Sequence, residues 1–398
     1  MYFKNGKIFT EGKFKPGGFL VENGRFKEII ISKSDVPYTG SQTDSEYVDL
    51  HGAYVIPGLV DIHIHGAVEE DFSDSDETGL HRIAEYLMSQ GVTSFLPTTM
   101  TISRDDYLRA AEIITLTDED NPGREARVLG MRMEGPFLSA EKKGAQNETF
   151  IQKPDFGFFQ EIQKKSGGNV KIIDIAPEIE GAEDFIRKVI ANSKDIVSEK
   201  DEEFNGKSNR TVLSLGHSAA TYEEAKHTFE LGAGHVTHLF NAMNSVHHRH
   251  PGMIPAAAEN GKVTTEIIAD GIHVHESMVR MAFKLFPNRI CIISDALRCL
   301  GVPDGEYMLS GQKIIKNGGV ARLENGTLAG AASSEYDGML NLIRFGIPVE
   351  EAILAATKVP ADIIGNKDIG AIEAGRFADF VVCDENLKLK EVYVGGVK

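Results

Sequence analysis

The sequence predicts an α/β protein: a (β/α)₈ TIM-type barrel with a small β-sandwich domain built from both chain termini. Eight short apolar segments in the middle of the chain alternate with helical stretches that end at glycine. Both ends of the chain instead alternate apolar and polar residues around Asn-Gly and other glycine turns. The length of 398 residues, with 41% hydrophobic side chains, suffices for a barrel and a smaller second unit.

The small domain is expected to combine the two ends of the chain. At the N-terminal end, "YFKNGKIFT", "GFLVENGRFKEIII" and "EYVDLHGAYVIPG" have the pattern of strands joined by tight turns, and so does "ADFVVCDENLKLKEVYVGGVK" at the other end. Chain ends often lie close together in a domain. We therefore predict that residues 1–54 and 366–398 form one β-sandwich domain, and that residues 55–365 form the barrel.

Within the barrel, the eight strands are expected at residues 59–65, 92–98, 127–134, 170–177, 211–217, 235–240, 264–270 and 289–296. Their spacing suits repeated βα units and a parallel sheet. Helices are expected over segments such as 78–91 and 221–234, each of which ends at glycine. Two segments interrupt this rhythm: the polar stretch 193–209 predicts a surface excursion, and 305–330 predicts β-hairpins after the eighth strand.

The charge of the chain restricts its partners. The formal net charge is −17, which argues against nucleic acid or an anionic membrane surface as a partner. An anionic small molecule would need a local basic pocket. Three cysteines without CxxC spacing, no apolar signal core and no run of 18 apolar residues predict a cytoplasmic protein without a membrane span.

Ionisable side chains stand at the ends of several predicted strands, where a barrel places its chemistry. They are His63 and His65 after the first strand, Glu134 after the third, His217 after the fifth, His238 on the sixth and Asp295 after the eighth. Unpaired polar groups are costly to bury. Imidazole and carboxylate are ligands of Zn²⁺ and Fe²⁺, so a catalytic divalent metal accounts for the set.

The HxH spacing of His63 and His65 is weak evidence by itself, because the chain holds three such pairs. His248 and His250 lie in a segment without a strand pattern, and His275 of the third pair runs into a helix. His63 and His65 lie on a strand, where residues i and i+2 share a face, so both rings can converge on one ion. Asp61 shares that face and could orient a ring. Two buried core histidines remain the alternative for this pair.

A series of motifs resembles the N-acetylglucosamine-6-phosphate deacetylases of the amidohydrolase superfamily. "PGLVDIHIHG" is similar to the first-strand signature of that superfamily. The deacetylase motifs follow in order: "MEGPFL", "LGHSAA", "THLFNAM", "HHRHPG", "IIADGIHV", "SDA" and "TLAG". "ATKVPADIIG" and "GAIEAGRFADFVV" resemble the closing region. The resemblance spans nearly the whole chain and implies a metal-dependent homodimer that hydrolyses N-acetylglucosamine 6-phosphate to glucosamine 6-phosphate and acetate, in amino-sugar catabolism.

The resemblance also implies residue roles. Glu134, His217 and His238 would hold the principal metal, while His63 and His65 would bind a second ion with Glu134 as the bridge. Asp295 would be the general base and acid. The resemblance further implies substrate contacts at Ala145, Gln146, Asn241, Ala242, Arg249, His273, Leu328, Ala329 and Gly330. Zinc or iron is expected, as one or two ions per subunit.

Two positions depart from the common family pattern. Gln146 stands where many members have a histidine, and it can donate a hydrogen bond but carries no charge. His250 stands where an acidic residue is common. These departures bear on specificity. Another amidohydrolase, such as a cyclic amidase, is one alternative, although Glu134 stands where such enzymes place a lysine. A non-catalytic sugar-phosphate-binding protein is the other.

Overall fold

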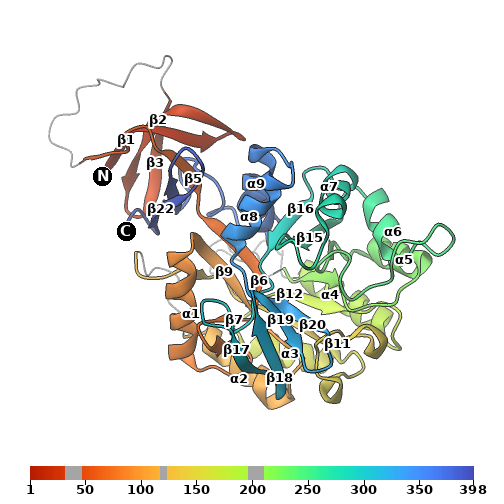
Figure 1. Cartoon of the computed structure of the whole chain (residues 1–398). Coiled ribbons are helices and arrows are strands. Elements are labelled where there is room, and N and C mark those ends of the chain that lie inside the picture. The colour runs from red at the N-terminus through yellow and green to blue at the C-terminus, as the bar shows by residue number, and fades with distance from the viewer. Residues whose placement is uncertain (32–46, 117–122, 196–209) are drawn as a thin grey trace.

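The computed structural model of the protein describes residues 1–31, 47–116, 123–195 and 210–398. At its centre is a parallel sheet in the order β6, β9, β11, β12, β13, β14, β15 and β16. The backbone N–H groups of Asp295 and His65 donate to His63 and Ala296, both at 2.9 Å, which joins the last strand to the first. The eight strands therefore nearly close a barrel (Figure 1), as the sequence predicts.

The barrel strands are β6 (Leu59–Ile64), β9 (Val92–Thr99), β11 (Met131–Phe137), β12 (Val170–Ile175), β13 (Val212–Leu215), β14 (His235–Val236), β15 (Thr264–Ile268) and β16 (Ile290–Ile293). The predicted third strand, 127–134, is wrong in its bounds. Its first part is β10 (Arg127–Val128), which pairs with β9, and Gly130 at φ 125° separates it from β11. The predicted sixth strand, 235–240, is too long, because the backbone turns to positive φ at His238 and Phe240.

The described helices cover the outside of the barrel and follow the strands (Figure 1). They are α1 (Glu77–Ser89), α2 (Arg104–Ile114), α3 (Phe156–Lys165), α4 (Ala182–Asp195), α5 (Tyr222–Leu231), α6 (Met253–Glu259), α7 (Glu276–Leu285), α8 (Glu335–Arg344), α9 (Val349–Ala356) and α10 (Lys358–Ile363).

Helix α1 shows how the sequence forms these elements. Asp76 caps its first turn by accepting from Gly79 N at 2.9 Å. Leu80, Ile83 and Leu87 recur at helical spacing and are buried. Burying each such side chain contributes on the order of 1.5–3 kcal/mol, so packing of this face holds the helix on the sheet.

A second sheet of seven strands combines both ends of the chain (Figure 1). Its strands are β1 (Tyr2–Thr10), β2 (Lys13–Glu22), β3 (Arg25–Ile31), β4 (Tyr47–Asp49), β5 (Tyr54–Pro57), β21 (Phe380–Cys383) and β22 (Leu389–Tyr393). Phe19 packs against both Phe26 and Phe380, with ring centroids 5.1 and 4.9 Å apart, so the sheet curls around an aromatic core. The expected domain bounds, 1–54 with 366–398 and 55–365, stay a prediction.

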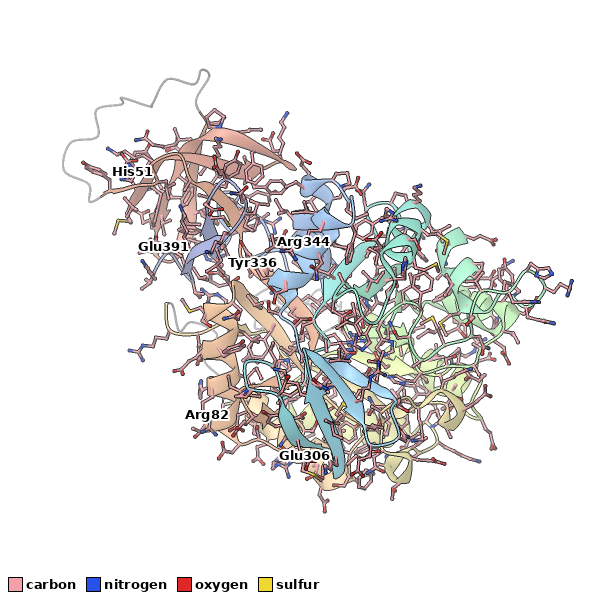
Figure 2. The ribbon with its side chains drawn as sticks, viewed as in Figure 1. His51, Arg82, Glu306, Tyr336, Arg344 and Glu391 are labelled. Atoms are coloured by element: carbon pink, nitrogen blue, oxygen red, sulfur yellow. The ribbon has the colours of Figure 1, made fainter. Side chains whose placement is uncertain are left out.

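Two contacts tie the small sheet to the barrel. Arg127 Nε lies 2.9 Å from Asp379 Oδ2, and both side chains are buried. Tyr336 of α8 lies where the two parts meet (Figure 2), with its hydroxyl 3.1 Å from Cys383 Sγ. All four side chains are buried, and the two contacts link the small sheet to the barrel.

The predicted hairpins follow the eighth strand and form an antiparallel sheet. Its strands are β17 (Gly305–Leu309), β18 (Gln312–Asn317), β19 (Val320–Leu323) and β20 (Leu328–Ala331). A two-stranded ribbon, β7 (Gly66–Ala67) and β8 (Glu70–Asp71), follows β6. The predicted surface excursion at 193–209 lies almost wholly outside the described residues. Among the residues described, none of the helices has the length and apolar character needed to cross a membrane.

Candidate active site

Glu134 is the common partner of the predicted metal ligands. It projects from β11 at the carboxyl end of the barrel, and its Oε1 lies 3.0 Å from both His217 Nε2 and His238 Nε2. The two histidine nitrogens are 3.1 Å apart. One nitrogen from each ring and one carboxylate oxygen thus converge on a single point, as ligands of a divalent cation do.

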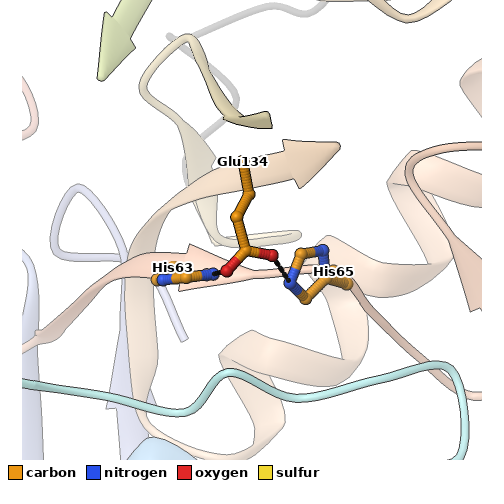
Figure 3. A group of neighbouring side chains, drawn as sticks. All are labelled: His63, His65 and Glu134. Carbon is orange, nitrogen blue, oxygen red and sulfur yellow. Dashed lines mark ion pairs between the residues drawn. The ribbon is translucent and has the colours of Figure 1, made fainter. Parts of the chain in front are cut away.

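The first-strand histidines contact the same carboxylate, one at each oxygen (Figure 3). His63 Nε2 lies 3.3 Å from Glu134 Oε1, and His65 Nε2 lies 3.2 Å from Glu134 Oε2. Both histidine side chains are buried, and they come from β6 and the residue that follows it. Glu134 therefore belongs to both groups of imidazoles, and its carboxylate could serve a cation in either group.

Asp295, two residues after the end of β16, reaches the second group. Its Oδ1 lies 3.2 Å from His65 Nε2 and 3.5 Å from His63 Nε2. Its side chain keeps 11% of its exposure, whereas that of Glu134 keeps 3%. Asp295 is thus the carboxylate of the cluster that is most open to the pocket above.

The charges of the cluster are strongly coupled. Burial by itself would raise the pKa of Glu134, but His63, His217 and His238 outweigh it and hold that pKa well below the usual range. Burial disfavours charged His65, yet its bonds to Asp295 and Glu134 raise the pKa of His65 to about 9. Protons and a cation therefore compete for these nitrogens.

Three of the predicted metal-binding and catalytic residues have a left-handed backbone. The φ values of His217, His238 and Asp295 are 47°, 27° and 50°. β13 and β16 end two residues before His217 and Asp295, so these side chains leave the strand ladder and turn toward the axis of the barrel. Non-glycine residues rarely adopt such angles, and when they do they cluster at functional sites.

A pocket opens above the cluster and gathers nearly all the predicted substrate contacts. Its lining includes Ala145, Gln146, Asn241, Ala242, His273, Leu328, Ala329 and Gly330, together with His65, Glu134, His217, His238 and Asp295. Arg249 does not line it, because it lies exposed in the loop after β14. No lysine or arginine is among the described residues that line the pocket. The predicted roles in substrate binding stay predictions.

Comparison with known proteins identifies the family of this chain. The pattern of the Amidohydrolase family matches residues 54–398. The chain belongs to the amidohydrolase family. The N-acetylglucosamine-6-phosphate deacetylase of Caenorhabditis elegans is 32% identical over 99% of this amidohydrolase and 93% of the relative. The N-acetylgalactosamine-6-phosphate deacetylase of Escherichia coli O157:H7 is 30% identical over 92% of both chains.

A solved structure gives the same result. The N-acetyl-D-glucosamine-6-phosphate deacetylase of Mycobacterium smegmatis, solved as an aspartate-to-alanine variant in complex with N-acetyl-D-glucosamine-6-phosphate, superposes with a TM-score of 0.87. The two sequences are 26% identical, and the superposition covers 100% of this chain and 98% of the solved chain. The predicted barrel fold and the predicted membership of the amidohydrolases are confirmed.

The donor set of this amidohydrolase fits a divalent cation. Four imidazole nitrogens and carboxylate oxygens of Glu134 and Asp295 face one another inside the barrel. His63 Nε2 is buried and has no hydrogen-bond partner, so this nitrogen has a free position for a ligand. The second nitrogen of His217 contacts Lys142 O at 3.0 Å, and that of His65 contacts Thr98 O at 3.1 Å. Such contacts fix which nitrogen faces a metal.

Gln146 contacts the cluster itself. Its Oε1 accepts from Thr101 N at 2.7 Å, which fixes the orientation of the amide, and its Nε2 then donates to Glu134 Oε2 at 2.6 Å. A residue predicted to contact substrate thus also restrains the carboxylate between the two groups of histidines.

Sequence reasoning missed the groups beneath the cluster. The suggestion that Asp61 orients a histidine ring is wrong: Asp61 Oδ1 accepts from the backbone N–H of His63 at 3.1 Å. The ring of His63 instead contacts Glu266, at 2.6 Å between Nδ1 and Oε1. Glu266 in "TTEIIAD" and Arg132 in "LGMRMEG" are charged residues within otherwise apolar strands. A charged residue in an apolar strand is rarely buried without a partner, and this pattern could have identified both residues from the sequence.

The other two HxH pairs differ from the first. His248 and His250 lie in an exposed loop, as predicted. His275 is the N-cap of α7 and accepts from Ser277 N at 3.2 Å. His273 lines the pocket, and its Nδ1 lies 2.7 Å from Asp270 Oδ2. Of the three pairs, His63 and His65 are the one whose two rings both lie beside Glu134.

Proposed function

We propose that this protein is a metal-dependent deacetylase that hydrolyses N-acetylglucosamine 6-phosphate to glucosamine 6-phosphate and acetate, in amino-sugar catabolism. The observation that carries the proposal is the cluster of Glu134, His217, His238 and Asp295 at the floor of one pocket. The family membership and the names of the relatives agree with it. We infer zinc or iron, in one or two ions per subunit, because imidazole and carboxylate suit both metals.

Glu134, His217 and His238 would hold the principal cation, and His63, His65 and Glu134 would hold a second one. A divalent cation in such a site polarises a carbonyl oxygen and lowers the pKa of water from about 16 to roughly 7. Replacing His63 by Gln and His65 by Asn should reduce the metal content per subunit. If the double variant bound as much metal as the parent, the second site would be wrong.

Asp295 would perform the proton transfers. Burial by itself would raise the pKa of Asp295, but His63 and His65 lower it, so the carboxylate is ionised and can accept a proton. It would take a proton from the attacking water and then deliver it to the sugar nitrogen as the C–N bond breaks. Gly330, Ala329 and Leu328 of β20 would form the wall beside the acetyl group.

The phosphate would be bound at the outer end of the pocket. His273 and Asn241 line this pocket, and we propose that Arg249 supplies the fixed positive charge that the lining lacks. We also propose a homodimer, in which the exposed loop that carries Arg249 lies near the partner subunit. Light scattering coupled to size exclusion would measure the mass in solution, and a single-subunit mass would refute the dimer.

The test of the activity is acetate release from N-acetylglucosamine 6-phosphate by the metal-loaded protein. N-acetylgalactosamine 6-phosphate is the first alternative substrate, because one relative carries that name. The unphosphorylated sugar tests the phosphate requirement, and a cyclic amide such as dihydroorotate tests the alternative reaction class. Binding of the sugar phosphate without acetate release would favour a non-catalytic protein.

A further inference from the structure

We propose that Glu266 is a positioning residue of the metal centre, which orients His63 so that its Nε2 can bind the second cation. The inference rests on the proposed function only in that it requires the cation site between Glu134, His63 and His65. Glu266 lies on β15, on the opposite side of the barrel from β11 in strand order. Its side chain is completely buried. Among the described contacts, the backbone N–H of His238 is its one link to a residue that lines the pocket.

The carboxylate of Glu266 receives four contacts, two at each oxygen. Oε1 lies 2.6 Å from His63 Nδ1 and accepts from the backbone N–H of His238 at 3.0 Å. Oε2 accepts from Arg132 Nη1 at 2.6 Å and lies 3.1 Å from His235 Nε2. A carboxylate has about four acceptor positions, so this one is fully used.

The pairing with Arg132 fixes the proton of His63. Arg132 is fully buried and lies within 3.1 Å of both Asp174 oxygens as well as of Glu266. Next to a guanidinium, Glu266 is ionised and can only accept hydrogen bonds. With a cation bound at Nε2, the ring proton of His63 would therefore be on Nδ1, because Nε2 is the nitrogen that faces Glu134 and Asp295.

Glu266 also supports the strained backbone of the principal site. His238 has φ 27°, a conformation that persists only when its surroundings hold it. The backbone N–H of His238 donates to the Glu266 side chain, and that of Leu239 donates to the Glu266 carbonyl oxygen at 2.8 Å. One residue thus contacts both groups of histidines from beneath.

A structural role alone does not explain this arrangement. Buried charge networks gain little over well-packed apolar side chains, and a barrel interior is usually filled by branched apolar residues. Arg132 and Glu134 are two residues apart on β11 and share its inner face, so the network lies directly below the metal ligands. Carboxylates that accept from the distal nitrogen of a metal-binding histidine are a recurrent way to orient it.

The variant Glu266→Gln tests the inference, because an amide cannot accept at both ends. Its NH₂ group must face either Arg132, a donor, or His63 Nδ1, which would move the ring proton to Nε2. Asp174→Asn is the matched control. Asp174 is equally buried and pairs with the same guanidinium, but among the contacts described it touches no histidine.

Zinc binding to the full-length protein is measured by equilibrium dialysis with metal analysis, a readout independent of turnover. We expect Glu266→Gln to bind the second zinc about 10- to 100-fold more weakly, and to weaken the principal zinc less, because the ring of His238 keeps its contact with Glu134. Asp174→Asn should bind both zinc ions as the parent does. An unchanged second affinity in Glu266→Gln, equal weakening in Asp174→Asn, or a parent that binds a single zinc would overturn the inference.

A second measurement, on the parent protein, does not depend on the stability of a Glu266 variant. Long-range ¹H–¹⁵N spectra of the zinc-loaded protein report which nitrogen of each histidine carries a proton, and loss of one set of signals in His63→Gln assigns that residue. We expect the proton on Nδ1 of His63. A proton on Nε2 would refute the role of Glu266. Absence of acetate release by the same parent sample would refute the proposed activity and leave this result intact.

Discussion

Replacing Asp295 by Asn separates proton transfer from metal binding. The substitution keeps the size of the side chain and removes its capacity to accept a proton. Asn is also among the residues that best tolerate a left-handed backbone, so the φ of 50° at this position should be kept. The backbone bonds from Asp295 N to His63 O and from Ala331 N to Asp295 O involve no side-chain atom and should remain.

The size of the effect follows from the position of the carboxylate. General acid–base catalysis contributes typically about 10²–10⁴ in rate. At 1.36 kcal/mol per tenfold, that corresponds to an increase of about 3–5 kcal/mol in the activation free energy. The principal ligands Glu134, His217 and His238 form a group without Asp295, so the variant should retain the principal metal.

The assay compares acetate release under saturating substrate with metal content and thermal unfolding of the same preparation. The expected result is a loss of kcat by two to four orders of magnitude, with the principal metal present and an unchanged unfolding temperature. Turnover equal to that of the parent would refute the role of Asp295. A variant that has lost its principal metal would show that Asp295 acts as a ligand, which also contradicts the reasoning.

Three further predictions follow from the site and the fold. Chelation should abolish activity and added zinc should restore it; activity that survives complete removal of metal rejects the proposed site. Asp379→Ala leaves Arg127 buried without its carboxylate and should lower the free energy of unfolding by about 3–5 kcal/mol, whereas the exposed Asp362→Ala should cost roughly 0–1 kcal/mol in urea titrations. Burial by itself would lower the pKa of His273, but Asp270 raises it. While Asp270 is ionised, the stabilisation from this pair is therefore complete below about pH 6.5, and it is lost as the pH rises through the raised pKa of His273. Asp270→Asn should remove that component of the pH dependence, and identical slopes for both proteins would contradict it.

Several features were evident from the sequence because they depend on local pattern. The alternation of apolar strands and amphipathic helices is encoded within short windows, so the barrel could be predicted from periodicity. His63 and His65 could be chosen among the HxH pairs because residues i and i+2 of a strand share a face. Glu134, His217 and His238 could be selected because parallel strands place their carboxyl ends at one edge.

The bounds of the strands could not be predicted well, because tertiary contacts decide them. "HVTHLF" has a strand-like composition, yet its backbone leaves the ladder after Val236 and turns to positive φ at His238. Contacts from Glu266, 28 residues further along the chain, hold that turn. No local pattern in the segment encodes a bond to a side chain so far away.

By itself, the sequence determined the kinds of chemistry available to this protein: apolar periodicity for a barrel, and histidines and carboxylates where strands end. The tertiary structure alone decided how these groups pair. In the folded barrel, Glu134 contacts histidines of both groups. The ring of His63 contacts Glu266 rather than Asp61, and Gln146 donates a hydrogen bond to the Glu134 carboxylate. The reason is physical: periodicity fixes which face a side chain takes, whereas its hydrogen-bond partner depends on distances across the closed barrel.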